Sequence, residues 1–162
     1  MNEINFNFEN TSFPLAQQRT DFFSLWIKHI ADLHHKQIGE LNYIFCSDDY
    51  ILEINKQYLN HHYNTDIITF NYNKSNTLNG DIFISLDTVR ENAKLYSNND
   101  FNEELDRVVI HGVLHLIGFN DKTEEEQLEM TTQEEVALNL RDVSRETLQK
   151  NINNNKNVSR ET

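Results

Sequence analysis

Two histidines four residues apart, His111 and His115, are the residues of this sequence best suited to chemistry. They lie in the run VVIHGVLHLIGFND, residues 108–121, whose apolar spacing predicts a helix. That spacing places both imidazoles on one face of the helix, one turn apart, where they can share a tetrahedral metal ion. Burying two unpaired imidazoles there would cost free energy, which a bound metal would recover.

Gly118 and Asp121 supply two further features that such a site needs. A glycine three residues after His115 can adopt the left-handed conformation that ends a helix sharply. The chain can then double back, so that the Asp121 carboxylate faces the same ion. Three protein ligands leave a fourth position for water, as in catalytic rather than structural zinc sites. A histidine pair alone is common by chance, so the prediction depends on the glycine and the carboxylate as well.

The residue after His111 is Gly112, and this excludes one familiar mechanism. Zinc peptidases with the pattern H-E-x-x-H carry a glutamate at that position as general base. Without it, the base must come from elsewhere or be a hydroxide on the metal. Peptide hydrolysis is therefore less favoured than phosphodiester hydrolysis, in which charge stabilisation by a metal contributes more of the acceleration.

Hydrophobic periodicity predicts the elements that position this helix. We expect strands at about 2–8, 41–47, 66–72 and 81–86, and helices at about 18–35, 48–58, 87–97, 102–117 and 122–140. Asp87 is a candidate cap of the third helix, and residues 73–80 have the composition of a long hairpin loop. The order of elements indicates a small mixed sheet covered by helices.

Length and composition set the broad class. A chain of 162 residues is expected to form one domain with a modest core. The single cysteine, Cys46, excludes an internal disulfide, fits a reducing compartment and is expected to be a buried strand residue. Neither an export signal nor a membrane-spanning run is recognisable, so we expect a cytoplasmic location.

The charge balance is strongly acidic. The net charge is −12, from 14 basic and 26 acidic residues, and residues 1–140 carry 9 basic and 23 acidic residues, a balance of −14. Phosphate binding depends on clustered lysine and arginine, so this balance, taken alone, argues against a nucleic-acid partner. It suits metal binding and solubility.

The last part of the chain differs from the rest. We expect residues 1–141 to form the metal-binding domain and residues 142–162 to be a polar, disordered tail. The pentapeptide VSRET occurs at 143–147 and 158–162, too few copies and too polar for a structural repeat. One codon choice for it contains the inverted repeat GTTTCACGTGAAAC, so we hypothesise that the tail is translated from paired DNA sites. Unrelated codons in the two copies would contradict this.

Three motifs occur in an order that matches a known family. HGVLHLIGFND resembles a signature H-G-x-L-H-L-x-G-Y-D-H, and TDIITF (65–70) and GDIFIS (80–85) resemble strands T-D-V-L-S-F and L-G-D-I-x-I-S. These are motifs of the bacterial YbeY family of metal-dependent endoribonucleases, and the resemblance covers about residues 40–140. It implies an α+β fold with a four-stranded mixed sheet, against which the metal-bearing helix packs before a tight glycine turn.

The resemblance assigns His111 and His115 as catalytic residues and as the first two zinc ligands. Asp121 falls where the family usually has its third histidine. This departure is chemically tolerable, because carboxylate oxygen binds zinc at about 2.0–2.2 Å. An anionic ligand would, however, weaken the Lewis acidity of the site and admit metals harder than zinc.

A second departure is Leu59, which stands where the family typically has an arginine that is thought to contact the RNA backbone. No arginine role can be carried over, and His61, His62 or a nearby lysine are candidate substitutes. The other carboxylates of the matched motifs, Asp66 and Asp81, are expected to be structural hydrogen-bond acceptors near strand ends rather than catalytic bases.

The resemblance implies a zinc-dependent, single-strand-specific endoribonuclease that matures the 3′ end of small-subunit ribosomal RNA and serves ribosome quality control. Its implied partners are the small ribosomal subunit, a ribosomal protein and a ribosome-associated GTPase, with no membrane. The alternative is a metal-containing ribosome assembly factor without significant nuclease activity, which Leu59, Asp121 and the acidic charge favour. A hydrolase of small molecules or peptides is a more distant third.

Overall fold

The computed structural model describes residues 3–11, 15–59 and 65–161, with side chains up to residue 156. Its elements, in chain order, are β1 (Glu3–Glu9), α1 (Gln17–Leu33), β2 (Gln37–Cys46), α2 (Asp48–Leu59), β3 (Ile67–Asn71), β4 (Thr77–Ser85), α3 (Leu86–Tyr96), α4 (Phe101–Ile117), α5 (Glu124–Asn139) and α6 (Arg141–Glu161). Within these ranges, no helix has both the length and the apolar character needed to cross a membrane.

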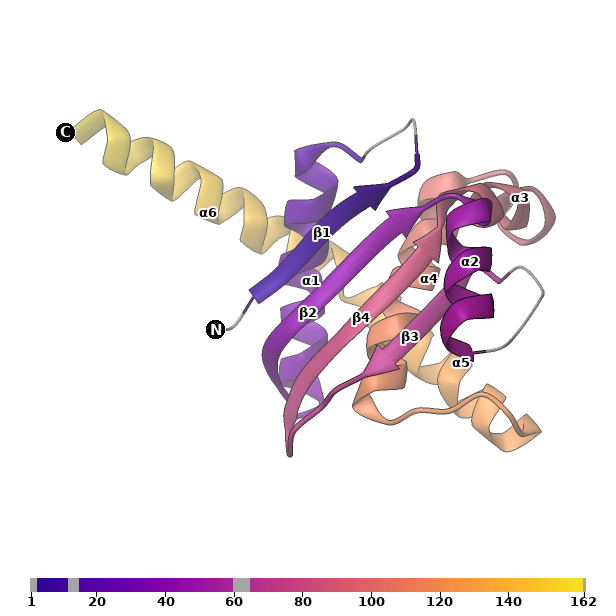
Figure 1. Cartoon of the computed structure of the whole chain (residues 1–162). Coiled ribbons are helices and arrows are strands. Elements are labelled where there is room, and N and C mark those ends of the chain that lie inside the picture. The colour runs from indigo at the N-terminus through magenta and orange to yellow at the C-terminus, as the bar shows by residue number, and fades with distance from the viewer. Residues whose placement is uncertain (1–2, 12–14, 60–64, 162) are drawn as a thin grey trace.

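The four strands form one mixed sheet in the order β1-β2-β4-β3 (Figure 1). β1, β2 and β4 are parallel, and β3 runs antiparallel to β4 at one edge. Helix α1 connects β1 to β2, and α2 and β3 intervene between β2 and β4, so the parallel strands have the crossover connections that they require. The predicted α+β class and four-stranded mixed sheet are thus confirmed.

The main core lies on the face of the sheet that α1 and α4 cover, behind the strands in Figure 1. Apolar side chains alternate along β1 and β2 to reach this face. The Phe6 ring stacks on Tyr43 and Phe45, with centroids 5.6 and 6.2 Å apart. Phe23 and Trp26 of α1 pack against the same layer and are fully buried. The helix that carries the two histidines therefore rests on a rigid aromatic and aliphatic core.

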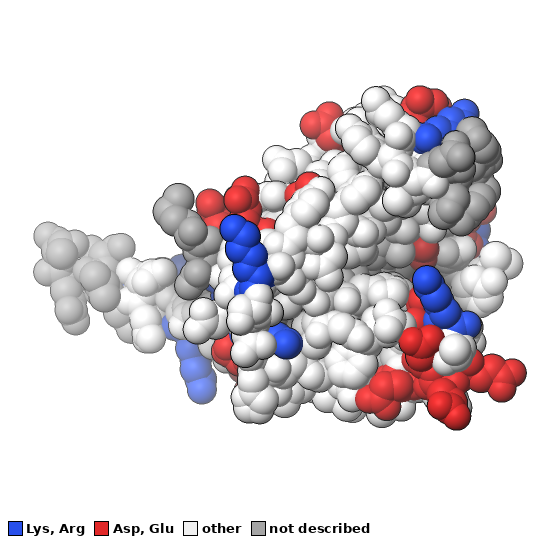
Figure 2. All heavy atoms as spheres, turned by 60° about the horizontal axis from the view of Figure 1, so that its bottom comes forward, with Lys and Arg blue, Asp and Glu red and all other residues white. Residues whose placement is uncertain are grey.

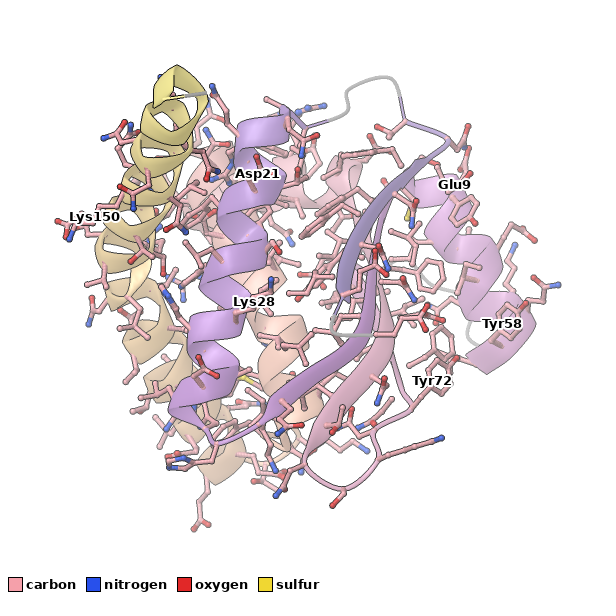
Figure 3. All side chains as sticks on the ribbon, turned by 90° about the vertical axis from the view of Figure 1, so that its left-hand side faces the viewer. Glu9, Asp21, Lys28, Tyr58, Tyr72 and Lys150 are labelled. Carbon is pink, nitrogen blue, oxygen red and sulfur yellow. The ribbon has the colours of Figure 1, made fainter. Side chains whose placement is uncertain are left out.

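The opposite face of the sheet carries only α2 among the described helices (Figure 1). A small second cluster lies beneath α2, and its buried members are Cys46, Ile51 and Ile68. Tyr58 and Tyr72 lie on this side of the sheet, whereas Asp21 and Lys28 of α1 lie on the other (Figure 3). Cys46 is buried at the end of β2, as predicted.

The C-terminal segment is a helix, α6, so the expectation of disorder from residue 142 was wrong. Ser144 is fully buried, and its hydroxyl lies 2.7 Å from Nδ1 of His29 on α1. The guanidinium of Arg145 lies over the ring of Phe22, 4.9 Å from its centroid. These contacts, which the composition of the segment does not reveal, dock the first turns of α6 on α1. The far end of α6 projects from the body (Figure 1). The domain boundary at residue 141 stays a prediction.

Two strands begin earlier than predicted. β2 begins at Gln37 rather than 41, and β4 at Thr77 rather than 81. Ile38 and Leu78, which are paired in register, are both buried. Half of the predicted loop at 73–80 is therefore strand, because burial of apolar side chains outweighs the turn preference of their neighbours.

The start of α3 also differs from the prediction. Ser85, rather than Asp87, caps this helix: its hydroxyl accepts a hydrogen bond from the backbone N–H of Thr88. The Asp87 carboxylate instead accepts from the backbone N–H of Asp48, at 3.0 Å. It thereby joins the starts of α2 and α3.

Candidate metal centre

Helix α4 presents His111 and His115 on one face. The helix begins at an Asp100 cap, whose side chain accepts a hydrogen bond from the backbone N–H of Glu103. Its apolar face is buried against the sheet. The two imidazoles lie at the edge of that face, with side chains 20% and 29% exposed and ring centroids 4.8 Å apart. Both rings are thus accessible from a common side, as their spacing predicts.

Gly112 lets α4 approach the sheet closely. A Cβ atom at this position would lie 3.0 Å from Cγ2 of Ile82 and 3.1 Å from Cδ1 of Ile67. The sheet therefore fills the space in which a peptidase of the H-E-x-x-H type carries its glutamate. Close packing of α4 against the sheet is therefore a physical reason for the absence of that general base.

The chain reverses after α4 and returns Asp121 to the two imidazoles. Gly118 is the C-cap of the helix with a φ of 128°, a conformation that side chains rarely adopt. The ring of Phe119 packs edge-on against His34, with centroids 5.4 Å apart. The backbone carbonyl of Asp121 accepts a hydrogen bond of 3.1 Å from Nε2 of Gln127 on α5. The loop is thus held at both ends.

The three predicted ligands come together with the spacing of metal donors. Oδ2 of Asp121 lies 3.3 Å from Nε2 of His111 and 3.5 Å from Nε2 of His115. In a tetrahedral zinc site with bonds of about 2.0–2.1 Å, neighbouring donor atoms lie roughly 3.3–3.4 Å apart. Within the described ranges, this is the only cluster of three such donors, and its atoms all lie within 4.8 Å of one another.

Glu134 is a residue of the candidate site that sequence reasoning missed. Its Oε2 lies 3.4 Å from Nδ1 of His111, on the ring nitrogen opposite Asp121. A carboxylate in this position fixes the orientation of a histidine ligand and raises its basicity. The sequence holds a signal for it: Glu134 shares one face of α5 with Met130 and Ala137, and all three are buried. A carboxylate in an apolar stripe requires a partner.

The two imidazoles have opposite electrostatic environments. Burial disfavours the charged form of His111, but the hydrogen bond and charge of Glu134, aided by Asp121, outweigh burial and raise the pKa of His111. Burial and the neighbouring His111 lower the pKa of His115, against the opposing effect of Asp121. A metal ligand must be neutral imidazole, so protons compete with the metal chiefly at His111.

Replacing Glu134 with glutamine is expected to weaken metal binding by about 10- to 100-fold, because His111 loses its carboxylate partner. Competition with a chromogenic chelator measures this affinity. Glu135→Gln is the matched control, since this side chain is 59% exposed and forms only a long ion pair of 3.8 Å with Arg107. Equal affinities in the two variants would exclude the assigned role of Glu134.

A cleft of about 490 Å³ opens beside the three donors, and β3 forms its other wall. Asp66 lines this cleft, although we predicted only a structural role for it. The charge of His111 and the backbone N–H groups of Asp66 and Ile67 do favour its ionised carboxylate. Burial nevertheless raises the pKa of Asp66. Asp81 faces the other side of the sheet and accepts from Nδ2 of Asn42 at 3.0 Å, as a structural acceptor would.

The surroundings of the cleft are poor in positive charge. No lysine or arginine of the described residues lines it. Leu59, the last residue of α2, is 40% exposed, and the candidate substitutes His61 and His62 lie outside the described residues. Acidic side chains gather at the start of α5, shortly after Asp121 (Figure 2). The described lining of the cleft thus offers metal donors but no lysine or arginine that would draw in a polyanion.

Together, the fold and the site define a class of small α+β proteins with an open, three-donor metal centre at the end of a helix. Residues 5–141 match the family model described as Endoribonuclease YbeY. The chain belongs to this family. Almost all of α6 lies beyond the matched region.

Similar proteins support the assignment along most of the chain. The endoribonuclease YbeY of Parabacteroides distasonis is 50% identical over 130 residues, which cover 80% of this chain and 89% of that protein. The endoribonuclease YbeY of Porphyromonas gingivalis is 44% identical over 138 residues, 85% and 89% of the two chains. The solution structure of TM1509 from Thermotoga maritima matches with a TM-score of 0.58 and 28% identity, covering 82% of this chain and 88% of that one.

Proposed function

We propose that this protein is a zinc-dependent endoribonuclease that hydrolyses phosphodiester bonds of single-stranded RNA. The observation that carries the proposal is the clustering of the His111, His115 and Asp121 donor atoms, all within 4.8 Å of one another, beside an open cleft. Two imidazole nitrogens and one carboxylate oxygen suit zinc, and an open fourth position suits hydrolysis. The relatives carry the name endoribonuclease, which supports RNA as the substrate.

A bound zinc ion would lower the pKa of water and polarise a phosphoryl oxygen. The two histidines and Asp121 would hold it, and Glu134 would keep the His111 ring in its binding orientation. We assign the role of general base to the Asp66 carboxylate, because it lines the same cleft as the donors. It would accept a proton as the oxygen of water bonds to phosphorus and the bond from phosphorus to the leaving ribose oxygen breaks.

The wall of the cleft that β3 forms offers neutral hydrogen-bonding groups to the RNA. Thr69 and Asn71 line it together with Thr65. These side chains can donate hydrogen bonds to phosphate oxygens and ribose hydroxyls without base specificity. These side chains position the RNA strand but supply little affinity for it, because no counterions are released when neutral groups bind phosphate.

We infer that affinity for the substrate comes from other molecules. The natural setting would be the cytoplasmic small ribosomal subunit, where the protein would trim the 3′ end of the ribosomal RNA and serve ribosome quality control. A ribosomal protein, and a ribosome-associated GTPase, would provide the docking surface. The net charge of −12 supports this proposal. An acidic protein is attracted by a basic ribosomal protein and repelled by naked RNA.

The test is cleavage of a single-stranded RNA by protein loaded with zinc, compared with protein stripped by a chelator. Asp66→Asn is expected to lower the rate by about 10²- to 10⁴-fold, the typical contribution of a general base. Asp81→Asn is the matched control, because this carboxylate lies on the other face of the sheet. Equal rates for the two variants would remove Asp66 from the mechanism, and equal rates with and without metal would refute the proposed activity.

A metal-containing assembly factor without nuclease activity is the second candidate. The absence of lysine and arginine from the described lining of the cleft, together with the exposed Leu59, favours it. Wild-type protein that binds small-subunit particles but cleaves no RNA, on the particle or off it, would establish this candidate and exclude the first.

A further inference from the structure

A second cavity adjoins the metal cleft. It measures about 300 Å³ and shares the wall formed by Asp66, Ile67 and His111 with the cleft. Its other side chains come from three helices, α3, α4 and α5. A nucleotide whose phosphate lies at the donor atoms could therefore place its base, or that of its neighbour, in this second cavity.

The cavity has hydrogen-bonding groups of both kinds. Glu104 and Glu134, at most 8% exposed, contribute carboxylate oxygens, and Arg107 and Asn92 contribute N–H donors. The Arg107 charge favours the ionised form of Glu104, although burial of Glu104 raises its pKa. Tyr96, 76% exposed, offers an aromatic ring at the rim.

These carboxylates do not form a second metal site. Within the described ranges, the only group of three or more donors close enough to share an ion is that of the metal centre. Separated acceptors beside a guanidinium and an aromatic ring suit a planar organic ligand that carries both N–H groups and carbonyl oxygen. The cavity is thus complementary to a base rather than to an ion.

We propose that this cavity is a base-recognition subsite that prefers guanine next to the cleaved phosphate, an inference that rests on the proposed function. The N1–H and N2 amino groups of guanine match the carboxylate of Glu104, and its O6 and N7 atoms match the guanidinium of Arg107. Tyr96 provides a surface on which the base stacks. Uracil fits poorly, because its carbonyl oxygens would face carboxylates.

Binding of the four ribonucleoside 5′-monophosphates to the metal-free full chain tests the subsite without any cleavage step. Isothermal titration calorimetry is expected to show guanosine monophosphate bound at least about tenfold more tightly than uridine monophosphate. Glu104→Gln, which turns an acceptor into a mixed amide, and Arg107→Ala are each expected to abolish most of this preference.

Two exposed residues of α3 supply matched controls, Glu91→Gln and Lys94→Ala, whose mutual ion pair lies outside the cavity. Both should retain the preference, and circular dichroism should show that all four variants are folded. Equal binding of the four nucleotides, or a preference unchanged in Glu104→Gln and Arg107→Ala, would overturn the subsite even if RNA is cleaved. A guanine preference in a protein that cleaves no RNA would uphold the subsite while the proposed function fails.

Discussion

Replacing His115 with alanine is expected to abolish metal binding and RNA cleavage while leaving the fold intact. The side chain supplies one of three donors, and the remaining pair, His111 and Asp121, cannot complete a tetrahedral site. Affinity for zinc should fall by more than about 100-fold, beyond the 10- to 100-fold loss typical of outer-shell partners. The fold should survive, because the imidazole lies at the edge of the buried face of α4 and is 29% exposed. Metal content by mass spectrometry and circular dichroism measure the two outcomes.

Three further variants sharpen this test. His35→Asn removes an exposed histidine from a position with a φ of 58°, which asparagine tolerates, and should leave the metal content unchanged. Asp121→Ala should lose the metal, whereas Asp121→His should retain it because an imidazole restores a third donor. Full zinc occupancy in His115→Ala, or unfolding of that variant, would contradict a solvent-accessible catalytic centre.

Asp106→Ala is expected to destabilise the protein by about 3 kcal/mol, the cost of leaving buried charges without their partner. The Asp106 side chain is 3% exposed and accepts hydrogen bonds from Arg19 at 2.7 Å and Arg141 at 2.9 Å. These arginines come from α1 and the start of α6, so a single carboxylate on α4 joins three helices. Both arginine side chains are 21–24% exposed, which places the cost at the lower end of the range.

Urea denaturation of the metal-free protein measures this loss of unfolding free energy. In a thermal melt, the same loss should lower the melting temperature by roughly 6–12 °C. Glu103→Ala is the control, because this half-exposed carboxylate also pairs with Arg141 but at the surface. Its loss should cost under about 1 kcal/mol. Similar destabilisation by the two substitutions would show that burial of Asp106 adds nothing to the network.

The clustering of the three candidate metal ligands could be predicted from the sequence because its geometry is local. His111, His115, Gly118 and Asp121 lie within eleven residues, and helix periodicity together with one glycine turn determines their arrangement. The bounds of most elements were also predictable to within a few residues, since apolar alternation and helical spacing reflect burial.

The outer parts of the site were not predictable, because tertiary packing creates them. Glu134 reaches His111 only because α5 crosses α4, 23 residues further along the chain. The second cavity likewise depends on three helices meeting over β3. Sequence periodicity identifies which face of a helix is buried, but it does not specify the neighbour.

For the C-terminal segment, the prediction of disorder was wrong because composition was taken as a measure of docking. Composition described residues 142–162 correctly as polar, but polarity does not measure docking. Ser144, Arg145 and Leu148 seat the first turns of α6 against α1 and the core, and a seated turn propagates as helix at little cost.

The close packing of Gly112 limits how this helix can change in evolution. A glutamate there would complete the pattern H-E-x-x-H, yet any Cβ at this position must displace Ile82 and Ile67. A glutamate at this position therefore requires the two isoleucine side chains of the sheet to shift by a few tenths of an ångström. A lineage that gained this base would do so at the expense of core packing between α4 and the sheet.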